Sequence, residues 1–271
     1  MDFISATAYP FRRTSRKGIK SSILRNMKTR FFPEISRPLL FAHRGCSHRA
    51  PENTMPAFEL AKKEGIPGIE LDVQLSADGE LAVFHDEKLE RICGVPGSIG
   101  DFSMKELQAM EAGAWKGAQY TGSGIPSLRQ VLEAFGGSII FDIEIKYYRF
   151  RESLEIPRLL GGLLEETGTL YRAAVSSFDP RIVRTAKRVL PRVPAGLIYD
   201  RRSLPSWLPL TAACRYSRAD FRKPAANMVG KSVRPGETVL CWTVDSPGEA
   251  RRCIDAGATG IISNRPEDLF T

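Results

Sequence analysis

Short apolar runs alternate with amphipathic stretches along most of the chain, from Pro38 to the carboxyl end. The apolar runs have the length of buried strands, and the amphipathic stretches have the length of helices with one apolar face. Strands are expected at 39–42, 68–73, 81–84, 139–146, 171–176, 194–199, 238–243 and 260–262, and helices at 55–64, 128–135, 152–166, 180–190 and 247–255. Strands and helices that alternate in this way predict a parallel sheet.

Capping and turn residues mark several of these boundaries. Asn53 or Thr54 can cap the first helix, and Ser127 can cap the second. Gly65 is typical of a residue that stops a helix. Asp78 followed by Gly79 indicates a hairpin turn between the strands at 68–73 and 81–84.

The size of the patterned region fits one domain. The chain has 271 residues, and one (β/α)8 barrel takes about 250. We therefore predict an α/β protein with a (β/α)8 TIM barrel over residues 38–271. An irregular, glycine-rich stretch of about 87–126 follows the strand that ends at His85, and a loop of that length inside a compact domain is usually functional. The stretch 200–236 gives no firm element.

The positive charge is concentrated before the barrel. The net charge is +8, and residues 1–37 contain nine basic and two acidic side chains, whereas the remaining residues are almost balanced. This distribution argues against a nucleic-acid-binding barrel, because such a barrel needs basic residues on its folded face. The basic N-terminal extension 1–37 is expected to be flexible. It is compatible with an organelle transit segment, with weak association with anionic membranes, or with a plain extension.

The cysteines bear on the compartment. Five are present, none forms a C-x-x-C pair, and no zinc-site spacing occurs. An odd number of widely spaced cysteines favours reduced thiols in the cytoplasm. The chain start lacks the pattern of a secretory signal, and no apolar run approaches the length of about 18 residues that a membrane span needs.

Charged side chains follow or interrupt several of the expected strands. In a parallel barrel the functional side chains gather at the carboxyl ends of the strands, so these residues are expected at one mouth. Glu70 and Asp72 are two positions apart, which places both carboxylates on one face of a strand. The full set is His43, Arg44, Glu70, Asp72, His85, Glu144 and Lys146.

Three of these residues predict a metal site. The carboxylates of Glu70, Asp72 and Glu144 would repel one another unless a cation lay among them. Oxygen ligands of this kind suit one divalent cation, Mg²⁺ or Ca²⁺. Taken singly, each of these residues could equally be a surface carboxylate or an ion-pair partner of Arg44 or Lys146.

The segments that contain these residues resemble the glycerophosphodiester phosphodiesterase family. The resemblance lies in FAHRGCSHRAPENTMPAFELA, GIELDVQLSADGELAVFHDE and FDIEIK, followed near the end by VLCWTVDSPGEARRCIDAGATGIISNRPEDL. It covers residues 39–269, and the motifs stand in the family's order. The resemblance implies that the stretch of about 87–126, after the strand that ends at His85, is a small insertion that family members carry over the barrel mouth. Asp245 departs from the asparagine that is common after WTV in the family.

This resemblance implies roles for individual residues. His43 and His85 correspond to the general acid/base pair, and Glu70, Asp72 and Glu144 correspond to the metal ligands. Arg44, Glu52, Lys146 and Trp242 correspond to residues at the substrate or phosphate, although Glu52 has no firm role. His48 matches no family role and is expected in a solvated loop.

The function that these residues predict is metal-dependent hydrolysis of a glycerophosphodiester to glycerol 3-phosphate and an alcohol. A histidine pair can give up and take the two protons that phosphodiester cleavage requires. An enzymatic alternative is a lysophospholipase D that acts on a one-tailed lipid. It would need an apolar groove, which insertion residues such as Leu89, Phe102 and Trp115 could line, unless they form the small core of the insertion. A second alternative is a non-catalytic barrel that binds a phosphodiester or a membrane.

Overall fold

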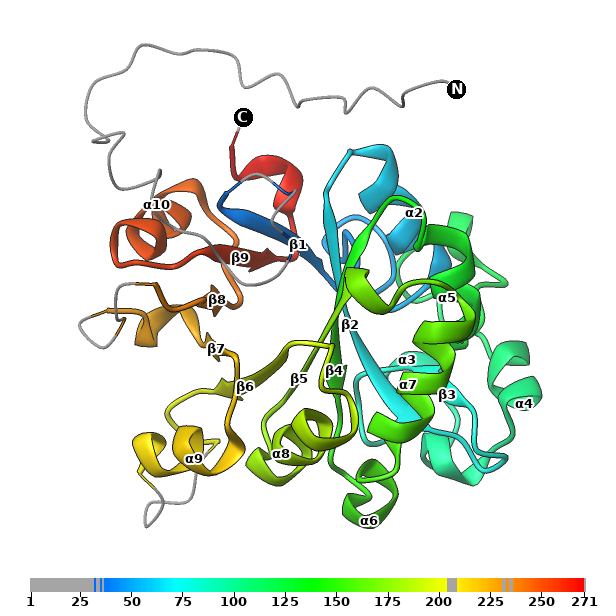
Figure 1. Cartoon of the computed structure of the whole chain (residues 1–271). Coiled ribbons are helices and arrows are strands. Elements are labelled where there is room, and N and C mark those ends of the chain that lie inside the picture. Colours follow the sequence, from blue (N-terminus) through cyan, green and yellow to red (C-terminus); the bar gives the residue numbers. More distant parts are fainter. Residues whose placement is uncertain are drawn as a thin grey trace, which may run out of the picture.

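The computed structural model describes residues 32, 35, 37–203, 209–230, 233 and 236–270. Parallel strands stand in the centre, and helices surround them (Figure 1). The strand order is β7, β6, β5, β4, β2, β1, β9 and β8, and isolated parallel bridges at Arg222–Val239 and Ala225–Trp242 join the two ends of the sheet. The predicted (β/α)8 fold is therefore confirmed as a nearly closed barrel of eight parallel strands.

The elements follow the hydrophobic pattern closely. The strands are β1 (Leu39–His43), β2 (Gly68–Leu75), β3 (Leu81–Val83), β4 (Ile140–Ile145), β5 (Ala173–Ser177), β6 (Ala195–Tyr199), β7 (Phe221–Pro224), β8 (Leu240–Cys241) and β9 (Gly260–Ser263). The longer helices are α2 (Met55–Lys63), α5 (Leu128–Phe135), α7 (Ile156–Glu166), α8 (Pro180–Val189), α9 (Leu210–Ser217) and α10 (Pro247–Asp255). The expected helix at 152–166 is divided into α6 (Phe150–Ser153) and α7. Sequence analysis did not assign α9 and β7.

One strand differs from the expectation. β3 pairs with β2 in the antiparallel sense and is not one of the barrel strands. The hairpin turn at Asp78–Gly79 is thus confirmed, but the prediction that His85 follows a parallel barrel strand is wrong. The hairpin still returns His85 to the mouth, because Val83 pairs with Val73 and the Phe84 amide donates to the Asp72 carbonyl.

The caps of the two helices behave differently. The Ser127 hydroxyl accepts a hydrogen bond from the Gln130 amide at the start of α5, as expected. Thr54 occupies the N-cap position of α2, but its hydroxyl donates to the Pro51 carbonyl and makes no cap hydrogen bond. Asn53 does not cap the helix either, because its side chain is directed to Asp72.

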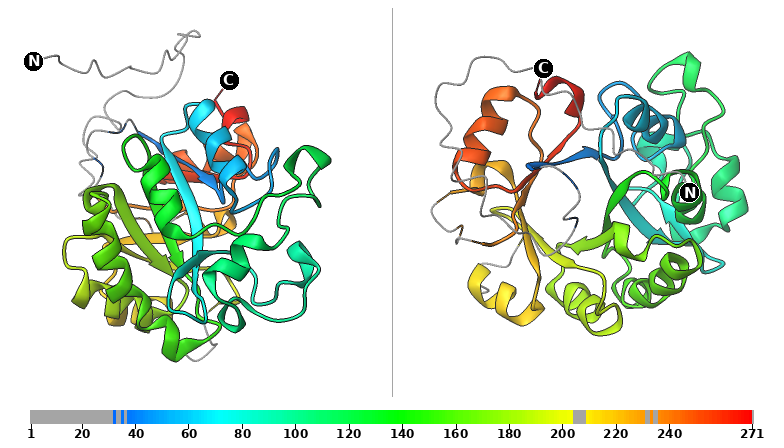
Figure 2. Two further views of the ribbon diagram at one scale, coloured as in Figure 1. Left: turned by 90° about the vertical axis from the view of Figure 1, so that its right-hand side faces the viewer. Right: turned by 45° about the horizontal axis from the view of Figure 1, so that its top comes forward.

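The insertion packs on one side of the barrel, next to β2 and β3 (Figure 2). It contains α3 (Glu90–Cys93), η1 (Ile99–Asp101), α4 (Met104–Ala109) and η2 (Ala118–Tyr120). Most of its apolar side chains bury one another in a cluster of Ala82, Phe84, Leu89, Ile92, Ile99, Met104, Leu107, Ala112 and Ile125. These residues therefore form a small core of their own, and Phe102 packs against it.

The side chains inside the barrel change from apolar to charged along the barrel axis toward the mouth. Alternate residues of a strand share a face, and on β1 and β4 the inward-facing series are Leu39, Phe41 and His43, and Ile140, Asp142 and Glu144. The lower positions belong to an apolar cluster with Phe32, Ala174, Phe221, Leu240 and Ile262. Charged side chains begin directly above this cluster. The barrel therefore has an apolar floor beneath a polar mouth.

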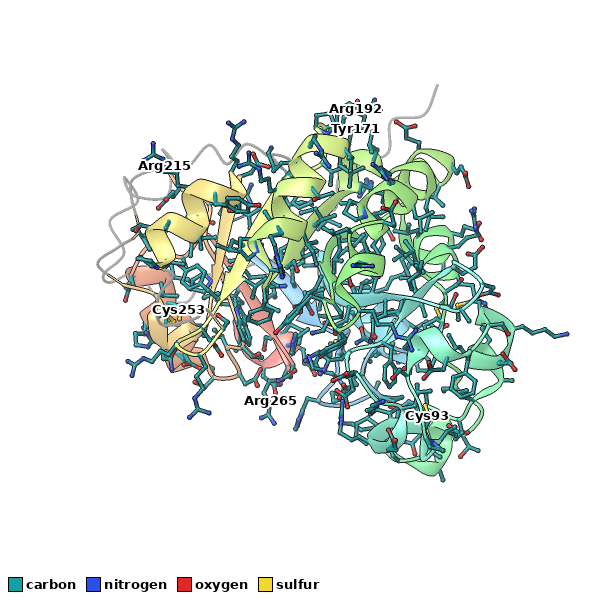
Figure 3. The ribbon with its side chains drawn as sticks, turned by 90° about the horizontal axis from the view of Figure 1, so that it is seen from below. Cys93, Tyr171, Arg192, Arg215, Cys253 and Arg265 are labelled. Atoms are coloured by element: carbon teal, nitrogen blue, oxygen red, sulfur yellow. The ribbon has the colours of Figure 1, made fainter. Side chains whose placement is uncertain are left out.

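The outer helices expose polar and aromatic groups. Figure 3 shows Tyr171, Arg192 and Arg215 at the periphery of the molecule, outside the helical layer. The five cysteines are free thiols, and burial raises the pKa of Cys46 to about 12, which keeps it a neutral thiol. Most of the predicted extension 1–37 lies outside the described residues, but Phe32 is buried and packs against Phe41.

Candidate active site

A sharp turn after β1 brings His43 and Arg44 to the mouth of the barrel. Arg44 has a φ of 56° and Gly45 has a φ of 80°. A side chain at Gly45 would lie 2.6 Å from the Ala57 Cβ atom, so both the backbone angle and the space require glycine there. The close packing of this turn against α2 fixes the position of His43 at the mouth of the barrel.

The ring of His43 has a defined orientation. Its Nδ1 atom lies 2.7 Å from the Asn264 Oδ1 atom. The Asn264 amide is itself oriented, because its Nδ2 atom donates to an Asp245 carboxylate oxygen at 2.7 Å. Since Asn264 Oδ1 can only accept, Nδ1 of His43 carries the proton and Nε2 is left for chemistry.

Three carboxylates converge beside His43. Asp72 on β2 is the register partner of Glu144 on β4, and Glu70 lies two positions before Asp72 on the same face. One oxygen from each of the three lies within 4.8 Å of the others, and all three residues are buried. Among the described residues, Glu70 Oε2 has no hydrogen-bond partner, and it lies 3.8 Å from His43 Nε2. A buried oxygen of this kind suits a metal ligand.

Two cations border the carboxylates on the mouth side. Lys146 Nζ lies 2.8 Å from Glu144 Oε1 and 3.5 Å from Asp72 Oδ1. Arg44 Nε lies 3.3 Å from Asp72 Oδ2. Burial raises the pKa of Asp72, but the charges of Lys146 and Arg44 outweigh this effect and hold its pKa far below the ordinary value. Asp72 is therefore ionised and available as a ligand.

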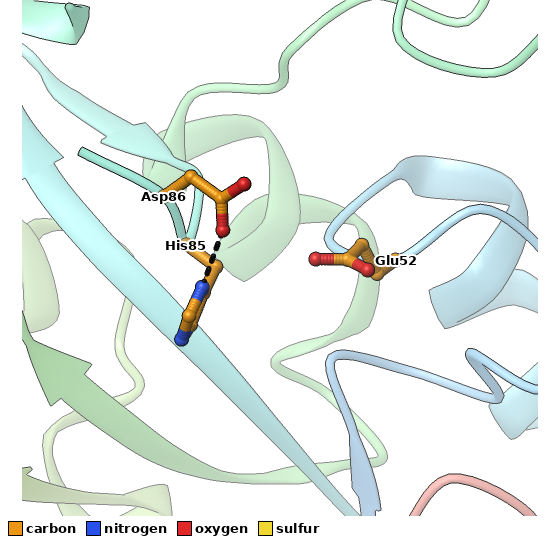
Figure 4. A group of neighbouring side chains, drawn as sticks. All are labelled: Glu52, His85 and Asp86. Carbon is orange, nitrogen blue, oxygen red and sulfur yellow. Dashed lines mark hydrogen bonds and ion pairs between the residues drawn. The ribbon is translucent and has the colours of Figure 1, made fainter. Parts of the chain in front are cut away.

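His85 and Glu52 form a second group on the insertion side (Figure 4). His85 Nδ1 lies 2.7 Å from Asp86 Oδ1, which again leaves Nε2 free. The carboxylates of Glu52 and Asp86 are bridged by Arg91, whose Nη2 atom lies 2.7 Å from Glu52 and 3.0 Å from Asp86. Both this group and the group of Glu70, Asp72 and Glu144 have the spacing of a metal site, but only the latter is buried and holds a carboxylate oxygen without a hydrogen-bond partner among the described residues.

Comparison with known proteins assigns the chain to a protein family. The model of the glycerophosphoryl diester phosphodiesterase family matches residues 43–268. The chain belongs to this family. It is 35% identical over 241 residues to a glycerophosphodiester phosphodiesterase of Caldanaerobacter subterraneus subsp. tengcongensis, a match that covers 86% of this chain and 97% of that protein.

Solved structures of glycerophosphodiester phosphodiesterases share the fold. The enzyme of Agrobacterium tumefaciens superposes with a TM-score of 0.70 at 25% identity, over 85% of this chain and 98% of that one. A phosphodiesterase of Oleispira antarctica, in complex with the product sn-glycerol-3-phosphate, superposes with a TM-score of 0.72 at 25% identity. That match covers 86% of this chain and 95% of the other.

All of the family positions predicted from sequence lie around one mouth of the barrel, although they lie at different depths within it. Trp242 lies on the far side from the insertion, where its ring packs edge-on against Phe178 at 5.5 Å and its Nε1 atom donates to the Lys223 carbonyl. The Glu52 Oε1 atom lies 2.9 Å from Arg44 Nη1, so Glu52 contacts a residue for which sequence predicts a phosphate contact. His48 is exposed and contacts Arg265.

Sequence analysis missed several residues of this phosphodiesterase-family site. Asp142 was visible in FDIEIK, where it stands two positions before Glu144, but it was not singled out. Lys223 was missed because β7 lies in the unassigned stretch 200–236. Arg91 gave no signal because it lies in the insertion, whose path no periodicity fixes, and Asn264 gave none because its partner His43 is 221 positions away.

Proposed function

We propose that this chain hydrolyses glycerophosphodiesters to glycerol 3-phosphate and an alcohol, with a divalent cation and two histidines. The observation that carries the proposal is the meeting of Glu70, Asp72 and Glu144 with two oriented histidines at one barrel mouth. Family membership and a related enzyme with bound sn-glycerol-3-phosphate support the substrate class.

The metal would be held by Glu70, Asp72 and Glu144. The donor set consists of oxygens only, which suits Mg²⁺ or Ca²⁺ and does not distinguish them. The unpartnered Glu70 Oε2 supports this assignment. When bound, such a cation neutralises charge on the non-bridging phosphate oxygens.

The phosphate would be positioned by Arg44 and Lys146. Both are cations at the mouth, next to the carboxylates of the proposed metal site. A guanidinium can hold two phosphate oxygens at once, whereas an ammonium acts as a point charge. Glu52 orients Arg44 through its hydrogen bond to Nη1. Trp242 supplies an apolar wall for the organic part of the substrate.

The two histidines would transfer the protons. Each has its Nδ1 atom engaged by a fixed oxygen, from Asn264 or from Asp86, and each keeps Nε2 for the substrate. One would protonate the departing alcohol and the other would remove a proton from the attacking hydroxyl or water. Each histidine is expected to contribute roughly 10²- to 10⁴-fold in rate.

The structure supports a small polar substrate over a one-tailed lipid. Most of the apolar residues that could have lined a lipid groove pack into the insertion's own core. Most of the residues that line the cavity next to Lys146 have polar side chains, among them Gln74, Glu87 and Ser98. Lysophospholipase D activity is therefore the second candidate, and a non-catalytic barrel is disfavoured because the predicted catalytic positions are filled.

We further propose that the protein works in the cytoplasm and that its basic extension adds weak attraction to anionic membranes. The five free thiols support a reducing compartment. Within the described residues, no helix is both long and apolar enough to cross a membrane. The positive charge of residues 1–37 supports the attraction to anionic lipid.

The deciding experiment measures glycerol 3-phosphate released from glycerophosphocholine and glycerophosphoethanolamine. Wild type, His43→Ala and a His48→Ala control would be assayed with Mg²⁺, with Ca²⁺ and with excess EDTA. We expect metal-dependent release that His43→Ala loses and His48→Ala retains. Release in EDTA at the full rate would contradict the metal role, and release from lysophospholipids alone would favour the lipid alternative.

A further inference from the structure

A fully buried lysine lies beneath the proposed metal ligands. Lys223 on β7 is 1% exposed, and its ammonium pairs with Glu70, whereas the Lys146 ammonium pairs with Glu144. Its Nζ atom lies 2.8 Å from Glu70 Oε1, 3.0 Å from Asp142 Oδ2 and 3.3 Å from Ser176 Oγ. It also lies 3.9 Å from Glu144 Oε2. One ammonium thus contacts two of the three metal ligands.

Asp142 accompanies Lys223 inside the barrel. It is 0% exposed, and its second oxygen accepts a hydrogen bond from Ser176 at 2.8 Å. Asp142 stands two positions before Glu144 on β4 and is the register partner of Glu70 on β2, so Glu70 and Asp142 face inward one layer below Asp72 and Glu144. The Lys223 ammonium contacts both carboxylates of this lower layer.

The charges around this layer nearly cancel. The four carboxylates of Glu70, Asp72, Asp142 and Glu144 face three cations, namely Arg44, Lys146 and Lys223. One negative charge is left over. A divalent cation would reverse this excess to one positive charge, which matches the single negative charge of a phosphodiester.

We propose that Lys223 is a buried cation, neutralised in part by Asp142, whose charge lowers the affinity of the site at Glu70, Asp72 and Glu144 for its metal. This inference rests on the proposed metal site. Lys223 orients one oxygen of Glu70 and leaves the other, Oε2, open toward His43. Its fixed positive charge also repels any divalent cation that the same carboxylates bind, and Asp142 moderates that repulsion.

The proposal predicts opposite effects for the two residues. Removing the ammonium leaves two excess negative charges, so Lys223→Met should bind metal more tightly. Removing the carboxylate charge leaves no excess, so Asp142→Asn should bind metal more weakly. The double variant restores the single negative charge and should return close to wild type. A merely structural role would weaken metal binding in every variant.

The experiment is titration calorimetry of metal-free protein with Mg²⁺ and with Ca²⁺. We expect Lys223→Met to lower the Kd by at least about tenfold, Asp142→Asn to raise it by about tenfold, and the double variant to lie within about threefold of wild type. Lys187→Met is the matched control, because this lysine pairs with Asp220 on the surface and should leave the Kd unchanged.

Thermal unfolding in EDTA and in metal supplies the second readout. We expect Lys223→Met to melt lower than wild type in EDTA and to gain more from added metal. If Lys223→Met does not fold, unchanged or tighter metal binding by Asp142→Asn would still overturn the proposal. If wild type and the variants bind metal equally tightly, the proposed role of Lys223 is wrong but the metal site stands. If wild type binds neither Mg²⁺ nor Ca²⁺, the proposed metal site itself is wrong.

Discussion

The Nδ1 atom of His43 lies 2.7 Å from the Oδ1 atom of Asn264, although the two residues are 221 positions apart. Asn264 is held in turn by Asp245 through both its amide hydrogen and its side chain. The first and last strands of the barrel, β1 and β9, are neighbours, and this pairing brings the two residues together. His43 is therefore oriented from the closing segment of the barrel.

We expect Asn264→Ala to lower kcat by about 10- to 100-fold with little change in KM, because the imidazole loses its orienting acceptor. Steady-state kinetics with glycerophosphocholine would measure the split. Ser47→Ala is the control, since it removes only a second donor to the same Asn264 oxygen. Equal losses in the two variants, or a change confined to KM, would contradict the orienting role.

Local pattern was sufficient to predict the barrel and the carboxylate site. The three carboxylates of the proposed metal site lie on β2 and β4, where alternation within one strand shows which residues share a face. Parallel strands then place these faces at one mouth. The hairpin turn at Asp78–Gly79 was also predictable, and it makes β3, which precedes His85, antiparallel to β2.

Long-range partners could not be predicted in the same way. Lys223 lies on a four-residue strand that ends in proline, and its ion pair with Glu70 spans 153 positions. A lysine in such a segment is ordinarily an exposed residue. Arg91 is 39 positions from Glu52 and belongs to the insertion, whose path no periodicity fixes. Only the three-dimensional structure brings these charges together.

Acid should destabilise the barrel through Asp72. Burial raises its pKa, but Lys146 and Arg44 outweigh this, so the folded pKa lies below the unfolded value near 3.8. A depressed pKa stabilises the folded state above the unfolded pKa, and that contribution is lost as the pH falls below about 4. Urea unfolding between pH 7 and pH 3 should show this loss. Asp72→Asn should be less stable at pH 7 and less sensitive to acid, and an unchanged pH slope would contradict the prediction.

Phe32 should contribute to stability although it precedes the predicted domain. Its side chain is 2% exposed and packs on the barrel floor against Phe41, with ring centroids 6.5 Å apart. We expect Phe32→Ala to lower the free energy of unfolding by about 3 kcal/mol. Leu159→Ala, at a side chain that is 42% exposed, should cost less than about 0.5 kcal/mol. Denaturant unfolding measures both, and equal stabilities would show that Phe32 is not part of the core.

Arg91 should connect the insertion to catalysis. Its guanidinium bridges Glu52, which orients Arg44, and Asp86, which orients His85. We expect Arg91→Met to lower kcat/KM by about 10- to 100-fold, because both functional side chains lose support. Arg91→Lys should recover only part of this loss, since an ammonium keeps the charge but cannot form the planar fork. Arg129→Met, which breaks a surface pair with Glu166, is the control and should leave turnover unchanged. Full activity in Arg91→Met would show that the insertion does not position the site.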